Sequence, residues 1–287
     1  MIKLSICGIS DLVYPYFKYG YTGRIHSIFH HSFNIIVGQH LIHVSGEREF
    51  LSSFGIQLES QDFQKLQGLQ IDDLVTLKKD KIIIYSQTDT YILSGPENVV
   101  QNMMVFRVEF SQDEIEEVLG LVETQLSFNK IGIEASSDFQ QIQEMMQSGH
   151  LSLSAIETII QFLIGRGLGL TPSGDDLLLG YFWGMRVLSD YLIQKEVEVY
   201  LSQNLRKTTV ISQAYLDAFL KGVVSSPIYR LNKSLERRDS YSANKAIQRI
   251  ATIGHTSGYD FLFGLFLSLK CIQKMKMRGT LYETEKS

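Results

Sequence analysis

The sequence contains only two cysteines, Cys7 and Cys271, which stand near opposite ends of the 287-residue chain. A disulfide framework needs more cysteines than this, and a structural zinc site needs cysteines or histidines in close pairs. Both residues lie in apolar stretches, LSICGI and SLKCIQK. We therefore expect two buried thiols and a chain that works in the reducing cytoplasm.

Long hydrophobic runs and a strong net charge are also missing. No stretch reaches the roughly 18 apolar residues of a membrane span, because the longest candidate, 177–188, is interrupted by Gly180, Gly184 and Arg186. The opening MIKLSICGIS has too short an apolar run for a signal peptide. A formal net charge of −4 gives no reason to expect nucleic acid or a membrane as a partner.

The first 110 residues have the pattern of β-strands. Stretches 33–45 and 73–94 hold short runs rich in Val, Ile, Leu and Tyr, separated by turn signals. These turn signals are Gly38-Gln39, Lys79-Asp80 and Thr88-Asp89. The alternating stretch 103–110 is placed to close the sheet. Since the connections are too short for helical crossovers, we expect about six to eight strands, mostly antiparallel.

Helices are expected from Ser111 to the end of the chain. Ser111 has the residue type of an N-cap, and apolar residues beyond it recur at spacings of three and four. The predicted helices are 112–127, 138–148, 152–163, 175–190, 193–206, 210–224, 227–238, 243–252 and 259–276. We therefore predict an α+β protein, with a mostly antiparallel β-rich domain over 1–110 followed by an all-helical domain over 111–287.

One short pattern occurs twice in the helical part. SGDDLLLG at 173–180 and SGYDFLFG at 257–264 share Ser-Gly-x-Asp-x-Leu-x-Gly and are offset by 84 residues (257 − 173 = 84). Each follows a glycine-containing loop and opens an apolar helix. The first turn of a helix carries unpaired N–H donors and a partial positive charge, so it binds phosphate or carboxylate where it is left open.

Helix capping is the simplest interpretation of this pattern. Ser173 and Ser257 would be the N-caps, and Asp176 and Asp260 would reach back to the cap, as in a capping box. Capping does not explain Asp175. Two adjacent carboxylates repel each other unless a cation, a Lys or Arg side chain, or a shared proton relieves them.

Other polar residues near these helix starts have two interpretations each. The cluster Thr208, Thr209 and Ser212 is either an ordinary N-cap or a third helix start that faces an anion. His255 is either a plain loop residue or a neutral donor or base beside a helix N-terminus. No Gly-x-Ser-x-Gly elbow is present, which argues against acyl-enzyme chemistry.

The N-terminal part offers a separate set of polar residues. Arg24 is a candidate anion clamp. His26 and His30 are four residues apart and could share a helix face, but without Cys, Asp or Glu nearby we expect no metal site there.

Three stretches together resemble the family represented by AllH, a subunit of oxamate carbamoyltransferase. They are GLGLTPSGDDLLLG at 167–180, TTVIS at 208–212 and GHTSG at 254–258, and GRIHSIFHHSFNI at 23–35 resembles the family's opening. The resemblance implies carbamoyl transfer between oxamate and phosphate, which links oxalurate to carbamoyl phosphate in purine and allantoin breakdown. It also implies a hetero-oligomer with two other subunits, one of which resembles acyl-CoA synthetases.

The chemistry of the helix starts and the resemblance together give a set of candidate site residues. The candidate catalytic residues are Asp175, Asp176 and His255. The candidate substrate-binding residues are Arg24, Gly167, Gly169, Thr171, Ser173, Gly174, Thr208, Thr209, Ser212, Thr256, Ser257, Gly258 and Asp260. No cofactor is expected beyond Mg²⁺, which the aspartates could ligate if further oxygen ligands complete the site. The expected partners are a small anionic substrate and the other subunits.

The sequence leaves three hypotheses open. The chain is a carbamoyltransferase subunit whose active site includes the three motifs, or it is a non-catalytic anion-binding or assembly subunit of an acyl-CoA-synthetase-like complex. In the third hypothesis, all three motifs are helix caps inside a helical bundle. A shared pocket requires the helix starts at Ser173, Thr209 and Ser257 to lie together in space.

Overall fold

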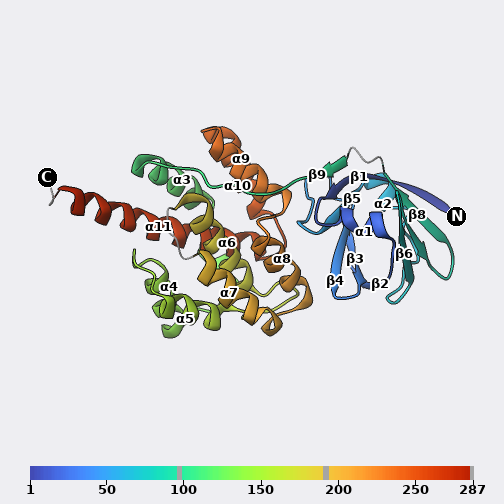
Figure 1. Cartoon of the computed structure of the whole chain (residues 1–287), viewed down its shortest axis with the longest axis horizontal. Helices are drawn as coiled ribbons and strands as arrows, with labels where there is room; N and C mark the ends of the chain where they lie inside the picture. Colours follow the sequence, from blue (N-terminus) through green and yellow to red (C-terminus); the bar gives the residue numbers. More distant parts are fainter. Residues whose placement is uncertain (96–98, 190–193, 285–287) are drawn as a thin grey trace. The chain divides into compact units, whose positions relative to one another are not determined.

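The computed structural model describes residues 1–95, 99–189 and 194–284 (Figure 1). The chain forms two compact units, a β-rich unit of Met1–Met104 and Gly222–Tyr229 and a helical unit of Val105–Lys221 and Arg230–Ser287. The predicted α+β class is confirmed. The domain boundary predicted after residue 110 stays a prediction, because a division into compact units does not show whether each part folds by itself. Among the described helices, none combines the length and the apolar character that a membrane crossing requires.

The described strands of the β-rich unit form a nine-stranded sheet in the order β5-β4-β3-β2-β6-β7-β8-β1-β9. They are β1 (Ile2–Ser10), β2 (Tyr21–Ile28), β3 (Ser32–Val37), β4 (His40–Ser45), β5 (Gly55–Leu58), β6 (Leu74–Lys78), β7 (Lys81–Tyr85), β8 (Thr90–Ser94) and β9 (Val100–Gln101). Two short helices, α1 (Tyr14–Tyr19) and α2 (Ser60–Phe63), lie between strands in the sequence. Because β1 also pairs with β5, the sheet closes on itself around a core of buried aliphatic side chains.

The predicted hairpins are confirmed. β3 and β4 pair antiparallel across Gly38, and β6 and β7 pair antiparallel across Asp80. Both turn residues have positive φ, 60° and 75°, which tight hairpin turns require. Most strand pairs are antiparallel, as predicted, but β1 runs parallel to β8 and β9, and β4 runs parallel to β5. Turn signals cannot reveal these pairs, since no hairpin joins their strands.

The strand predicted over residues 103–110 is wrong. Val105 and Val108 are buried, so the apolar alternation is real. Met104 forms only an isolated β-bridge with Val223, and from Phe106 onward the backbone finds its partners on helices. Phe106 donates its N–H to Asn232 Oδ1 at 3.1 Å and accepts from Asn232 Nδ2 at 3.0 Å, and Val108 N–H donates to the Val187 carbonyl at 2.8 Å. A side-chain amide thus satisfies an extended segment that has the sequence pattern of a strand.

The predicted helices are confirmed with small shifts at their ends. They are α3 (Gln112–Gln125), α4 (Ser137–Met146), α5 (Leu153–Leu163), α6 (Ser173–Leu188), α7 (Gln194–Asn204), α8 (Val210–Leu220), α9 (Ser226–Glu236), α10 (Ser240–Ala251) and α11 (Ser257–Thr284). Positions 190 and 193, at the ends of two predicted helices, lie outside the described residues. The Ser111 N-cap is confirmed by a reciprocal capping box with Glu114.

Two helices form the centre of the helical unit. Every residue of α6 except Asp176 and Arg186 is buried, which is the pattern of a core helix. The contact between α6 and α11 is the most extensive of any pair of described helices. Figure 1 shows α11 running through the unit. This packing explains why 177–188 is so apolar, and it brings the two copies of the repeated octapeptide into contact.

Candidate functional site

The first motif forms the loop that leads into α6. Gly167 and Gly169 have φ values of 116° and 92°, a region that side chains rarely allow. A Cβ atom on Gly167 would lie 2.7 Å from the backbone nitrogen of Ser173, so the loop lies tightly against the helix start. The N–H of Gly174 donates to the Arg166 carbonyl at 2.8 Å. The glycines therefore set the path of the chain into the helix.

The capping box predicted at this helix start is wrong. Pro172 occupies the N-cap position, no side chain caps the helix, and Ser173 is its first residue. The N–H groups of Asp175 and Asp176 donate to the Pro172 carbonyl at 2.9 and 3.3 Å. Proline has no side-chain acceptor, so the turn is closed by backbone alone. The Ser173 hydroxyl and the Asp176 carboxyl are therefore not used for capping.

Asp175 ties the first motif to the second. It is 3 % exposed, and both of its carboxyl oxygens accept hydrogen bonds. Oδ1 accepts from the Gly165 N–H at 2.8 Å, and Oδ2 accepts from the Thr208 hydroxyl. Burial raises the pKa of Asp175, and the bonds from Thr208 and Gly165 oppose that rise. The carboxylate that capping leaves unexplained thus joins the glycine loop to the start of α8.

The second motif opens α8, where the N-cap interpretation is confirmed. The Thr209 hydroxyl accepts from the Ser212 N–H at 3.1 Å, and Ser212 is buried. The same hydroxyl donates to the Leu170 carbonyl. A Cβ atom on Gly165 would lie 2.5 Å from the Lys207 carbonyl oxygen, so only glycine fits against this segment. The start of α8 is therefore packed directly on the glycine loop.

The third motif opens α11 beside the start of α6. The hydroxyl oxygens of Thr171 and Ser257 are 2.9 Å apart, and those of Ser173 and Thr256 are 3.4 Å apart. A Cβ atom on Gly258 would lie 1.9 Å from the Ile250 carbonyl oxygen, so this helix start is also closely packed. Hydrogen bonds therefore connect residues 165–176, 208–212 and 256–260, which we call the three-motif cluster.

The contacts between α6 and α11 indicate an approximate two-fold relation between their repeated octapeptides. A Cβ atom on Gly180 would lie 1.9 Å from the Phe261 carbonyl oxygen, and one on Gly264 would lie 2.0 Å from the Leu177 carbonyl oxygen. These contacts are reciprocal, because both pairs of equivalent residues differ by 84 (264 − 180 = 261 − 177 = 84). The repeated octapeptides therefore occupy equivalent positions, and the positive N-terminal ends of both helices meet in one place.

The two equivalent aspartates have unused oxygens at this meeting point. Asp260 is fully buried, and its Oδ1 accepts from the Gly132 N–H at 2.8 Å rather than from a cap. Among the described residues, Oδ2 of Asp176 and Oδ2 of Asp260 are buried without a hydrogen-bond partner. Burial raises the pKa of both carboxyls. Hydrogen bonding from Ser257 opposes the rise at Asp176, whereas the charges of Asp260 and Asp175 add to it; bonding from Gly132 and Ser173 opposes the rise at Asp260. A buried carboxyl oxygen without a partner is unfavourable for folding, so Oδ2 of each residue is a candidate for binding a ligand.

Residues 128–132 complete the cluster, although no motif in the sequence reveals them. A Cβ atom on Gly132 would lie 2.1 Å from Ser173 Oγ. Lys130 donates to the Tyr259 hydroxyl at 2.9 Å, and its Nζ lies 4.7 Å from the centre of that ring. Tyr259 is the two-fold equivalent of Asp175, so a lysine–tyrosine pair stands where the other half has a carboxylate. A single glycine or lysine in a loop has no sequence signature, and only the fold reveals its place.

Gly132→Ala is expected to lower the melting temperature, because its Cβ would lie 2.1 Å from Ser173 Oγ and would force that side chain to shift. Thermal unfolding measures this loss. The melting temperatures of Gly132→Ala, Ser173→Ala and the double variant give a double-mutant cycle. The cycle measures the coupling between the added Cβ and the Ser173 hydroxyl. If the two substitutions have purely additive effects on melting temperature, the close approach of Gly132 to Ser173 is wrong.

Other predicted residues lie outside the cluster. Arg24 is exposed on β2 of the β-rich unit and donates to the Asp72 carbonyl at 3.4 Å. His255 is exposed in the turn before α11. The helix face suggested for His26 and His30 is wrong, because His26 lies in β2 and His30 follows that strand. In the described parts of the chain, no three His, Cys, Asp or Glu side chains are grouped to hold a metal ion.

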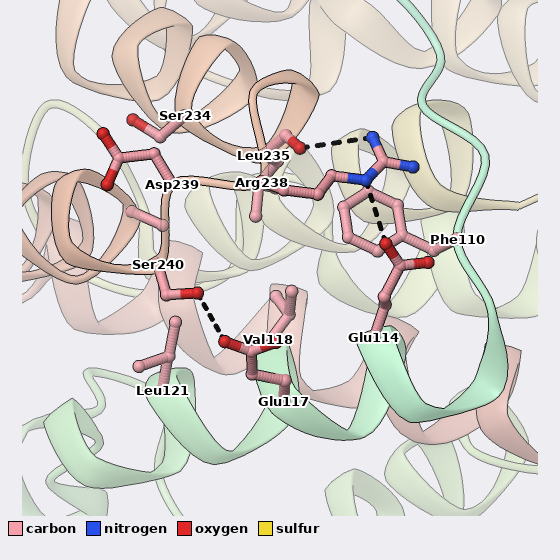
Figure 2. Close-up of a pocket in the computed structure, with 11 residues that line it drawn as sticks. Phe110, Glu114, Glu117, Val118, Leu121, Ser234, Leu235, Arg238, Asp239 and Ser240 are labelled. Atoms are coloured by element: carbon pink, nitrogen blue, oxygen red, sulfur yellow. Dashed lines mark hydrogen bonds and ion pairs between the residues drawn. The ribbon is translucent and has the colours of Figure 1, made fainter.

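A small hollow between α3 and the turn from α9 to α10 is a structural junction (Figure 2). Its volume is about 40 Å³, room for water but far below the roughly 300 Å³ of a ligand pocket. Arg238 Nε donates to Glu114 Oε1 at 2.9 Å, and the guanidinium lies over the Phe110 ring at 4.7 Å. The Ser240 hydroxyl donates to Glu117. Because these polar groups pair with each other, the hollow is not a candidate site.

Two family models match the chain, one in its N-terminal half and one in its C-terminal half. Residues 3–95 match the AllH family N-terminal domain. Residues 163–269 match the family described as oxamate carbamoyltransferase subunit AllH, and this match includes all three motifs. No solved structure matches the chain. The chain therefore belongs to the AllH family, the family of an oxamate carbamoyltransferase subunit.

Proposed function

We propose that the three-motif cluster binds the carbamoyl compounds and small anions of the oxamate carbamoyltransferase reaction. One observation carries the proposal. Two carboxyl oxygens, on Asp176 and Asp260, are buried and unpaired among the described residues, beside two helix N-termini that meet. A group with both hydrogen-bond donors and negative charge would satisfy this site.

The meeting of α6 and α11 supports the binding of an anion. Each helix N-terminus carries about half a positive charge, so anionic oxygens are favoured beside the first turns of both helices, where Asp176 and Asp260 already lie. The Thr171–Ser257 and Ser173–Thr256 hydroxyl pairs lie at this point and can donate to anionic oxygens. Oxamate, oxalurate, phosphate and carbamoyl phosphate all have such oxygens.

The aspartates suit the other end of the same molecules. A carbamoyl group ends in an NH₂ with two N–H donors, and the Oδ2 atoms of Asp176 and Asp260 are two acceptors without a partner among the described residues. We therefore assign the NH₂ to these carboxyls and the anionic group to the hydroxyls. The bound NH₂ would also remove the unfavourable free energy of two unpaired buried oxygens.

The roles of the remaining candidates follow from their contacts. Asp175 uses both oxygens within the chain, which supports a positioning role for the glycine loop. His255 is exposed next to Thr256, where it could exchange protons with a bound substrate. Mg²⁺ at Asp176 and Asp260 would need hydroxyl or substrate oxygens to complete its octahedral shell. The catalytic roles of Asp175, Asp176 and His255 stay predictions.

Oxamate, oxalurate, phosphate or carbamoyl phosphate is expected to raise the melting temperature of the wild-type chain. Linkage gives about 2.7 kcal/mol of stabilisation at 100 times the dissociation constant. Ser173→Ala with Ser257→Ala should abolish the shift, because it removes hydroxyls at the meeting point of α6 and α11. Ser173 is not an N-cap, so its removal should leave α6 intact.

Ser137→Ala is the matched control, since Ser137 is an exposed first residue of α4. This control should keep the full shift. The proposal is wrong if no ligand stabilises the wild type, or if the double variant keeps its shift. Release of carbamoyl phosphate from oxalurate and phosphate by the assembled enzyme then separates the hypotheses. Binding to the cluster without an effect of the double variant on turnover would favour the non-catalytic subunit.

A further inference from the structure

The glycine loop presents apolar side chains to solvent beside the cluster. Leu168 is 93 % exposed and Leu170 is 50 % exposed. Val210, the first residue of α8, is 41 % exposed, and it adjoins Thr209, which bonds the Leu170 carbonyl. A single exposed leucine needs no explanation, but three apolar side chains gathered at the edge of a site indicate an interaction surface. We call Leu168, Leu170 and Val210 the apolar rim.

The backbone that carries the apolar rim is held in place by contacts on both sides of Leu168. Gly165 donates to Asp175 Oδ1, and the Gly174 N–H donates to the Arg166 carbonyl at 2.8 Å. The Arg166 guanidinium lies 3.9 Å from the centre of the Phe162 ring, and Nε of Arg166 donates to the Phe162 carbonyl at 2.8 Å. Such a preorganised loop loses little conformational freedom when a partner covers it.

Three cationic side chains flank the apolar rim. Arg166 precedes it in the loop, and Arg206 and Lys207 precede Thr208 and Thr209 at the start of α8. All three are exposed, and none forms an ion pair within the described residues. Charges of one sign around an apolar surface select a partner with the opposite sign. A second copy of this chain would bring the same cations against each other, which disfavours self-association through this face.

We propose that the apolar rim, with Arg166, Arg206 and Lys207, is the docking surface for a companion subunit of the carbamoyltransferase. The partner presents an apolar pocket bordered by carboxylates. This inference rests on the proposed function, since it places the partner at the edge of the same cluster. The companion subunit covers the meeting point of α6 and α11 from the side of the glycine loop, and it excludes water from the bound carbamoyl group.

The test uses the full chain and its companion subunits. Leu168→Ser with Leu170→Ser should weaken association at least about tenfold when the chain is titrated onto immobilised companion subunits. Leu153→Ser is the matched control, because Leu153 is 47 % exposed at the start of α5 and lies outside the rim. Arg206→Glu with Lys207→Glu should also weaken association and reduce its dependence on salt, whereas Lys245→Glu on α10 should not.

The isolated rim variants should keep the melting temperature of the wild type and its shift with oxamate or carbamoyl phosphate, because the altered side chains are exposed. Unchanged affinity of the leucine variant for the companion subunits overturns the proposal. Self-association of the wild type that the leucine variant abolishes also overturns it, since a second copy is then the occupant. Failure of the proposed function has a different result: no ligand raises the melting temperature of the wild-type chain.

Discussion

Asp176→Asn is expected to make the chain more stable and the assembled enzyme inactive. Its Oδ2 is buried without a partner among the described residues, and the nearby Asp260 and Asp175 carboxylates repel its charge. An amide removes that charge and its repulsion from the two carboxylates. Relief of an unpaired buried group contributes about 1–3 kcal/mol, which corresponds to roughly 2–12 °C in melting temperature. Turnover should fall at least on the order of 10²-fold, as when one preorganised site group is lost.

The stabilisation by Asp176→Asn should depend on pH. Burial raises the pKa of Asp176 well above that of the unfolded chain, so the folded state binds more protons between the two values. Wild-type stability therefore falls as the pH rises from about 4, the pKa of an unfolded aspartate, towards the raised pKa. The asparagine variant lacks this contribution. The difference in melting temperature should be small at pH 4 and should grow towards neutral pH.

Asp175→Asn is the matched control, because it alters the adjacent carboxylate with a different set of contacts. Both oxygens of Asp175 accept hydrogen bonds, from Gly165 and Thr208, and an asparagine amide can accept only one of the two, because its NH₂ donates. Asp175→Asn should therefore lower the melting temperature where Asp176→Asn raises it. Equal signs for the two variants, or full activity of Asp176→Asn, would show that the unpaired oxygen is not part of the site.

Gly180→Ala and Gly264→Ala are expected to give the largest losses of stability. Each added Cβ would lie within about 2 Å of a carbonyl oxygen on the facing helix, at 1.9 and 2.0 Å. α6 and α11 would have to move apart. The loss of unfolding free energy should therefore reach or exceed the upper end of the range for overpacked cores, about 3 kcal/mol. The separation would also pull apart the Thr171–Ser257 and Ser173–Thr256 pairs. Thermal unfolding and the ligand-induced shift measure both effects.

Gly120→Ala in α3 is the control for these substitutions. A Cβ atom there would meet no heavy atom within 4 Å, so alanine should stabilise the helix by about 0.5–1 kcal/mol. The two-fold relation makes a further demand: Gly180→Ala and Gly264→Ala should destabilise to a similar extent. A neutral effect of either would mean that the backbones of α6 and α11 do not touch as described.

Local signals were sufficient for much of the fold. The Ser111 N-cap and the turn at Gly38 need only neighbouring residues, and both are confirmed. Local signals failed where a distant residue satisfies the backbone. The apolar alternation of 103–110 has the pattern of a strand, but the Asn232 amide takes the place of a neighbouring strand and pairs with the backbone of Phe106. At α6 the serine is one position late for capping, because Pro172 already occupies the N-cap.

The sequence by itself determined the order of strands and helices, the hairpins and the three motifs, because these depend on periodicity and turn chemistry within short windows. Tertiary structure alone decided that the motifs meet, because the glycines that let α6 and α11 touch are 84 residues apart (264 − 180 = 84). It also separated the adjacent aspartates. Both carboxyl oxygens of Asp175 accept hydrogen bonds, from Gly165 and Thr208, whereas Oδ2 of Asp176 has no partner among the described residues. A sequence shows two neighbouring charges, but the chemistry of each depends on groups that only the folded chain brings to it.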